Sequence, residues 1–255
     1  MKVLATIVSI LISISVHAQV NGYAQVTAIT STTLTIGSSS ETYGTFVVGI
    51  PVIIMQMQDN AIGANTGNNS SFGNLSSLQS AGLYEIAHVT AVTRSSGSIT
   101  QILISSPLAN TYSFNSNSSV QLITYPLLGN NFTTTADISA VAWDGAIGGV
   151  VALRVTGTLT LNHNITADNA GFRGGAANAG NAGSCDNTTY ITAANELNAN
   201  KGEGFYKATN LSYAAGRAKI LTGGGGANSH NGGGGGGSNA SAGGEGGRGY
   251  GCSST

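Results

Sequence analysis

Hydrophobic and polar residues alternate along much of the first 128 residues, a period of two that is typical of β-strands with one buried face. Residues 24–29 and 34–36 flank a polar turn and predict a β-hairpin. Further strands are predicted at residues 47–58, 82–93, 99–105 and 120–125. About five or six short antiparallel strands predict a small β-barrel or β-sandwich.

The strand predicted at residues 47–58 has one face that is apolar and one that becomes rich in amides. The amides belong to Gln56 and Gln58, which alternate with methionines. A long loop of Asn, Gly and Ser follows at residues 59–81.

Residues 143–175 carry the most specific pattern of the chain. Apolar and polar residues again alternate over residues 150–167, and the apolar row includes Leu159, Leu161 and Ile165. Short strands separated by Gly-rich or Asn-rich turns indicate a β-solenoid-like coil of parallel strands. No fixed repeat length recurs, so a plain antiparallel meander is the alternative.

From residue 171 onward the composition shifts toward glycine, with uninterrupted tracts at residues 223–226 and 232–237. Glycine is the most costly residue to order, which favours a flexible linker. Polyproline II-type glycine helices can instead pack closely and hydrogen-bond to one another. Turn residues separate the tracts and favour such a folded-back, polyglycine-II-like bundle. Both interpretations stay open on the sequence.

The sequence predicts no stable helix, since only residues 191–197 have helical spacing and they are too few to stand alone. We therefore predict an all-β fold in four parts. These are a signal peptide at 1–18, a small antiparallel β domain at 19–128, a β-solenoid-like segment at 129–175 and a glycine-rich region at 176–255.

The first residues have the features of a secretory signal. Lys2 precedes an apolar stretch at residues 3–16, and a small-x-small pattern predicts cleavage between Ala18 and Gln19. A membrane anchor is disfavoured because the stretch is shorter than the roughly 20 residues that span a bilayer. We expect a secreted or cell-surface protein with no membrane span after cleavage.

Charge is scarce: 7% of residues are charged and the net charge is −1. An ordinary soluble domain carries roughly 25% charged residues. A nearly neutral chain has no strongly basic face, so we expect no nucleic-acid partner.

The two cysteines, Cys185 and Cys252, both lie in the glycine-rich region. In an oxidising compartment they can form a disulfide that closes a loop of about 67 residues. Free thiols are the alternative. A metal pair is disfavoured because no His or Asp stands at ligand spacing.

The acidic residues and histidines form no catalytic pattern. Asp144 lies in a turn, where a carboxylate usually caps backbone N–H groups. Glu85 would need a second carboxylate to act as a general acid, and Asp59 is the candidate in that domain. The histidines are too dispersed for a zinc motif. We expect no catalytic residue, cofactor or metal, and no enzyme activity.

Arginines and aromatic residues stand out in the glycine-rich part. Arg173 and Arg248 are expected to bond carbonyl groups or an acidic partner such as Glu245. Five aromatic residues are candidate ligand contacts, with core plugs beneath the glycine layer as the alternative: Tyr190, Phe205, Tyr206, Tyr213 and Tyr250.

Several stretches also carry a family resemblance: residues 52–58, 83–92, 107–112, 120–126, 141–175, 202–206 and 223–237. They are similar to the glycine-rich N-terminal regions of large exported surface and adhesin-like proteins of Bacteroidetes-type bacteria. The resemblance covers about residues 46–251 and is most specific at residues 143–149 and 171–175. An extra apolar step near Met55 departs from the family pattern.

The resemblance implies surface display and adhesion or gliding, with no catalytic residues. Partners would be a surface glycan or a neighbouring cell-surface protein. Because the chain ends within its glycine-rich region, we expect it to be a fragment. The alternative is the non-catalytic front of a secreted glycan-active enzyme, and a third hypothesis, an ice-binding or matrix protein, rests on low charge and Thr/Gly content.

Overall fold

A computed structural model of the protein describes residues 18–75, 77–178, 185–238 and 241–252. The predicted signal peptide therefore lies outside the described residues, except for Ala18. The all-β prediction is confirmed: the described chain forms ten strands and one short 3-10 helix, Leu211–Tyr213. Residues 191–197 form no helix, in keeping with their short length.

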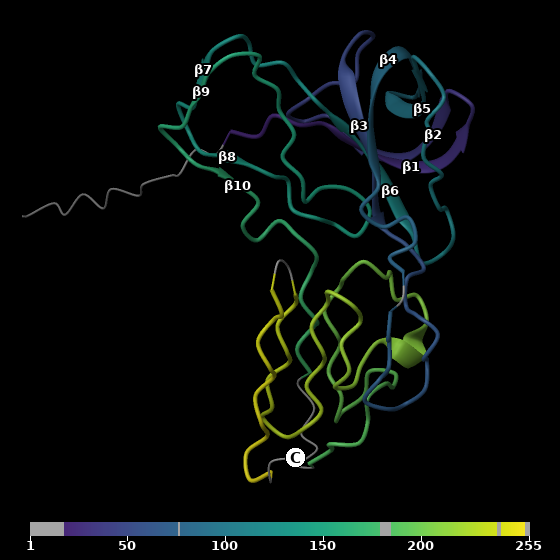
Figure 1. The fold of residues 1–255 in the computed structure, drawn as a ribbon, viewed down its shortest axis with the longest axis vertical. Helices are drawn as coiled ribbons and strands as arrows, with labels where there is room; N and C mark the ends of the chain where they lie inside the picture. Colours follow the sequence, from purple (N-terminus) through teal and green to yellow (C-terminus); the bar gives the residue numbers. More distant parts are fainter. Residues whose placement is uncertain (1–17, 76, 179–184, 239–240, 253–255) are drawn as a thin grey trace, which may run out of the picture.

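Six strands form the antiparallel sheet that was predicted for the first part of the chain (Figure 1). Their hydrogen-bonded order is β1-β2-β5-β4-β3-β6, and β6 also pairs with β1, so the sheet closes on itself. The strands are β1 (Tyr23–Thr30), β2 (Thr33–Ser40), β3 (Pro51–Gln58), β4 (Tyr84–Ser95), β5 (Ser98–Ile104) and β6 (Ser119–Thr124).

The inside of the closed sheet is filled by the alternating apolar residues of its strands. Leu34, Ile54, Ile102 and Leu122 are all 0% exposed. Each fully buried aliphatic side chain of this size stabilises the fold by about 1.5–3 kcal/mol. The period-two pattern of the sequence therefore corresponds directly to this core.

The amide-rich face of β3 lies inside the sheet. Gln56 and Gln58 follow Ile54 on the same face and are 0% exposed. The opposite face carries Ile53 and Met55, which are half-buried against a second apolar cluster that includes Ile147. Both faces of β3 are thus covered, and the polar one is buried more completely.

A second, smaller arrangement of parallel strand pairs follows the closed sheet. β7 (Phe132–Thr133) pairs with β9 (Leu159–Thr160), and β8 (Ile138–Ser139) pairs with β10 (Ile165–Thr166). The side chains of Asn131 and Asp137 accept hydrogen bonds from backbone N–H groups 27 positions further along, the same offset as the strand pairs. The pairing is parallel, so the antiparallel alternative does not describe it.

The apolar row predicted in this segment is buried only in part. Leu159 is 37% exposed and Leu161 is 60% exposed, whereas Ile165 is half-buried. Leu159 and Leu161 lie on the same face of their strand segment, and that face is only partly covered by other described residues.

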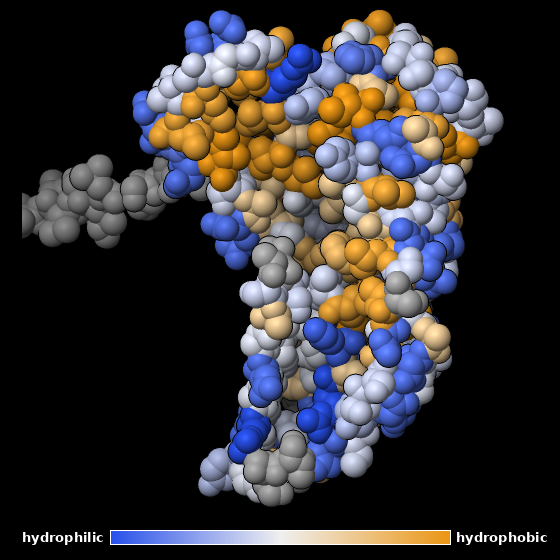
Figure 2. Space-filling model, in the orientation of Figure 1, coloured by the Kyte–Doolittle hydropathy of each residue, from blue (hydrophilic) through white to orange (hydrophobic). Residues whose placement is uncertain are grey.

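The glycine-rich region forms the other half of the molecule (Figure 1). Figure 2 shows that apolar residues are concentrated in the half that holds the sheet and the parallel pairs.

The loop at residues 59–81 packs against the glycine-rich region. Ile62 and Phe72 of this loop form an apolar cluster with Tyr206 and Ile220.

The described residues contain no helix that is long and apolar enough to cross a bilayer.

Candidate functional site: an aromatic joint and a glycine-lined groove

Trp143 lies at the joint between the parallel strand pairs and the glycine-rich region. Its side chain is 3% exposed and meets Phe172 edge-on, with ring centroids 5.7 Å apart. Phe172 in turn meets Phe205 edge-on at 6.0 Å. Edge-to-face pairs of this kind add about 0.5–1.5 kcal/mol beyond the area they bury.

Arg173 and Glu203 reinforce the joint. The Arg173 Nε and backbone N–H groups both donate to Glu203 Oε2 at 3.0 Å, and Glu203 N–H donates to the Arg173 carbonyl at 2.9 Å. Burial raises the pKa of Glu203, but the hydrogen bonds and the positive charge of Arg173 outweigh it, and the pKa is lowered overall. The Trp143 indole N–H is buried and has no hydrogen-bond partner among the described residues. The sequence predicted carbonyl groups or an acidic partner such as Glu245 for Arg173, and the acidic partner in the structure is Glu203.

Buried amides connect the closed sheet to the segments that follow it. Asn21 donates to the Thr124 carbonyl at 2.7 Å and accepts from Ala152 N–H at 3.0 Å. Gln121 exchanges two hydrogen bonds of 2.9 Å with the backbone of Gly148. Because these groups are buried, their loss would leave unpaired polar atoms that cost about 1–3 kcal/mol each.

Asp144, Glu85 and Asp59 all bind backbone or side-chain donors. Asp144 Oδ1 accepts two N–H groups of its own turn, at 2.8 and 2.9 Å, as predicted. Glu85 accepts two N–H groups of the loop at residues 109–110, both at 2.8 Å.

Asp59 is buried and accepts from four groups of the surrounding loops, at 2.7–3.2 Å. Among the described residues, no three His, Cys, Asp or Glu side chains lie close enough together to hold a metal ion. These carboxylates therefore organise loops.

The glycine tract at residues 223–226 is surrounded by neighbouring backbone on several sides. A Cβ atom on Gly224 would lie 2.0 Å from the Gly235 carbonyl oxygen. A Cβ on Gly225 would lie 2.3 Å from the Arg217 oxygen, and one on Gly226 would lie 2.0 Å from the Ala199 oxygen. Three consecutive residues thus face three different segments. Each residue is rotated by about a third of a turn from the one before it, as in a backbone with three residues per turn.

The tract at residues 232–237 repeats this period of three in its hydrogen bonds. Gly235 N–H donates to the Gly225 carbonyl at 2.9 Å, and Ser238 N–H, three residues on, donates to Thr222 at 2.7 Å. Gly236 N–H points elsewhere and donates to Gly244 at 2.8 Å. The N–H groups of Gly234 and Gly237 occupy the third direction and make no hydrogen bond within the described chain.

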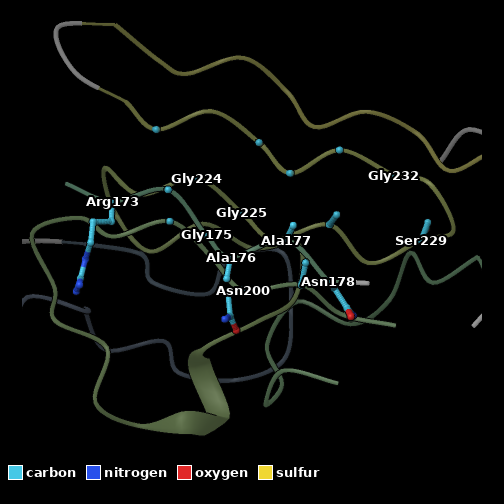
Figure 3. A pocket seen from close by; sticks show the side chains of 18 of the residues that line it. Arg173, Gly175, Ala176, Ala177, Asn178, Asn200, Gly224, Gly225, Ser229 and Gly232 are labelled. Atoms are coloured by element: carbon cyan, nitrogen blue, oxygen red, sulfur yellow. The ribbon is translucent and has the colours of Figure 1, made fainter. Parts of the chain in front are cut away.

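A groove of about 600 Å³ runs between the tract at residues 232–237 and the segment at residues 173–178 (Figure 3). Its lining is mostly glycine and alanine, and its floor includes Ala199, Asn200, Gly202, Gly224, Gly225 and Ala227. Its polar lining includes the Arg173–Glu203 pair, Glu196 and His230.

The predicted disulfide is present: Cys185 and Cys252 are bonded and lie 67 positions apart in the sequence. Gln19, expected as the first residue after signal cleavage, is half-buried, and its Nε2 reaches toward the Ala140 carbonyl. Ala18 makes a parallel bridge to Ile138.

Lys201 is a buried cation that the sequence did not single out. It is 7% exposed, its Nζ donates to the Tyr190 carbonyl at 2.8 Å, and it lies 4.7 Å from the Phe72 ring centroid. Burial lowers the pKa of Lys201 to about 7. No acidic residue of the described chain forms an ion pair with it.

The five candidate aromatic contacts are mostly packing residues. Tyr206 is buried and Tyr213 is half-buried in one cluster, while Phe205 belongs to the joint. The Arg217 guanidinium lies 5.6 Å from the ring centroid of the half-buried Tyr190. Tyr250 alone among these five is freely available, at 82% exposed.

Comparison of the chain with family models, curated proteins and solved structures gave no match.

Proposed function

We propose that this chain is an exported, non-catalytic module of the cell surface, which acts as a stalk or an adhesive part. The observation that carries the proposal is the bonding of the closed sheet, the joint and the glycine-rich region to one another. Buried amides, the Trp143 stack and the Arg173–Glu203 pair all contribute to this continuity. A spacer that holds a binding surface at a distance from the cell needs such continuity.

Two finer features belong to the same proposal. The parallel pairs with a 27-residue offset support the start of a β-solenoid-like coil. The period of three around residues 223–226 supports an ordered, polyglycine-II-like bundle in place of a flexible linker. Both are stiff arrangements with few charges, and the Cys185–Cys252 disulfide is suited to an oxidising environment outside the cytosol.

Surface labelling of intact cells tests the location. A short epitope inserted in the exposed turn between β4 and β5, next to Gly97, leaves the core undisturbed. Antibody should stain intact cells that express the tagged chain as strongly as permeabilised cells. Staining that requires permeabilisation would contradict surface display.

A glycan array and a pull-down from surface-biotinylated cells test adhesion. We expect a saturable glycan or protein ligand that is retained by the purified chain without being cleaved. Hydrolysis of a bound glycan would contradict the non-catalytic assignment.

A further inference from the structure

We propose that the groove beside residues 232–237 binds an extended, glycine-rich polypeptide from a partner, which joins the bundle as one more member. This inference concerns the purified chain and does not depend on where the protein is located.

The hydrogen-bonding directions of the tract supply the first argument. Its N–H groups at 235 and 238 serve one neighbour and the group at 236 serves a second. Gly234 and Gly237 represent the third direction, and both residues line the groove. Both residues are exposed and their N–H groups have no acceptor within the described chain. An incoming backbone carbonyl is the natural acceptor for each.

The opposite wall supplies complementary groups. Arg173 is bonded to Glu203 through its backbone, but residues 174–177 make no backbone hydrogen bond within the described chain. All four of these residues are exposed. Their carbonyl oxygens can therefore accept N–H groups from a chain that lies in the groove, whose own carbonyls accept from Gly234 and Gly237.

The lining sets the chemistry of the occupant. Backbone forms most of both walls, and Gly175 already lies so close to Asn200 that a Cβ would stand 2.0 Å from its carbonyl oxygen. At about 3.1 Å per residue, the six residues of the tract span roughly 19 Å, so about six residues of the partner would be held. Glycine is preferred because a side chain separates two such backbones.

Titration with synthetic peptides tests the proposal. The probe is a lysine-flanked hexaglycine peptide, and two controls replace the six glycines by alanines or by N-methylglycines. Alanine adds a Cβ to every residue, and N-methylglycine removes the N–H donors. Amide spectra of the labelled, purified chain should show saturable shifts at Gly234 and Gly237, with about tenfold weaker binding of either control.

A matched pair of variants completes the test. Gly174 and Gly171 are both exposed, and neither would meet an atom within 4 Å of an added Cβ, but only Gly174 lines the groove. Gly174→Phe should weaken hexaglycine binding about tenfold, and Gly171→Phe should leave it unchanged. The proposal is wrong if no saturable shift occurs at millimolar peptide, if the shifts centre on residues 243–247, or if both variants bind alike.

Discussion

Arg173 and Glu203 are joined twice, through their backbones and through their side chains, although 30 residues separate them in the sequence. This double connection fixes the segment that leaves the parallel strand pairs against a segment of the glycine-rich region. The Trp143–Phe172–Phe205 stack lies at the same joint. The joint therefore couples the two halves of the molecule.

Substitution Arg173→Gln should loosen the joint. The Arg173 side chain is 56% exposed, so we expect a loss of only about 1 kcal/mol in the free energy of unfolding. Amide hydrogen exchange at Glu203, whose N–H donates to Arg173, should accelerate. Arg94→Gln breaks a similar pair with Glu41 in the closed sheet and should leave exchange at Glu203 unchanged. Equal acceleration in both variants would contradict a local role.

The single tryptophan makes the joint observable by fluorescence. Buried Trp143 should emit at short wavelength and shift to long wavelength when the joint opens. Trp143→Ala removes a large buried aromatic group and should cost about 3–5 kcal/mol in denaturant unfolding. Trp143→Phe, which retains a ring against Phe172, should cost clearly less; an equal cost would exclude the ring contact as the reason.

Alanine substitutions distinguish an ordered bundle from a linker. Gly224→Ala, Gly225→Ala and Gly226→Ala each bring a Cβ within 2.3 Å of a backbone oxygen, and each should destabilise by about 1–3 kcal/mol. Gly174→Ala and Gly244→Ala meet no atom within 4 Å and should be neutral or stabilising by up to about 1 kcal/mol. Thermal unfolding measures all five variants, and a flexible linker would make all five alike.

Reduction of the disulfide should destabilise the glycine-rich half selectively. Closure of a 67-residue loop stabilises by about 4 kcal/mol in the chain-entropy model. After reduction, or in the double variant Cys185→Ser with Cys252→Ser, hydrogen exchange should accelerate at residues 214–238. Protection of β1 to β6 should persist. Loss of protection in both halves together would indicate that the disulfide also supports the sheet.

Lys201 predicts a pH dependence of stability. Its pKa is about 7 in the folded protein, against an ordinary value of 10.5 in the unfolded chain. Between these values the unfolded state binds more protons, so stability should rise as the pH is raised from 7 toward 10. The penalty is fully present below pH 7 and amounts to at most about 5 kcal/mol.

The variant Lys201→Met isolates this effect. It keeps the length of the side chain and removes the charge, and the Tyr190 carbonyl still accepts from Ala218 N–H. We expect the variant to be more stable than the natural chain at pH 6–7 and to lose the rise above pH 7. The exposed Lys219 offers the control, since Lys219→Met should leave the pH profile unchanged.

The strands of the closed sheet could be predicted because their apolar residues alternate locally. The burial of Gln56 and Gln58 could not, because the Gln58 side chain bonds to the Gly204 carbonyl, 146 positions away. An acidic partner for Arg173 could be predicted, but not which one, since no local pattern distinguishes Glu203 from Glu245.

Two further features show what the sequence can and cannot predict. The disulfide could be predicted, because the chain has two cysteines and is expected to be exported to an oxidising compartment. The exposure of Leu161 could not be foreseen, because alternation indicates which side chains share a face but not whether anything covers it. The groove has no sequence signal at all, since it arises from the way glycine tracts of similar composition are stacked.

The threefold geometry of the glycine tracts also limits how the gene can change. One inserted glycine would rotate every following N–H group by a third of a turn and aim it at the wrong neighbour. Whole turns of the backbone can be gained or lost without this misalignment, so the proposed bundle should accept tract lengths that differ by multiples of three residues.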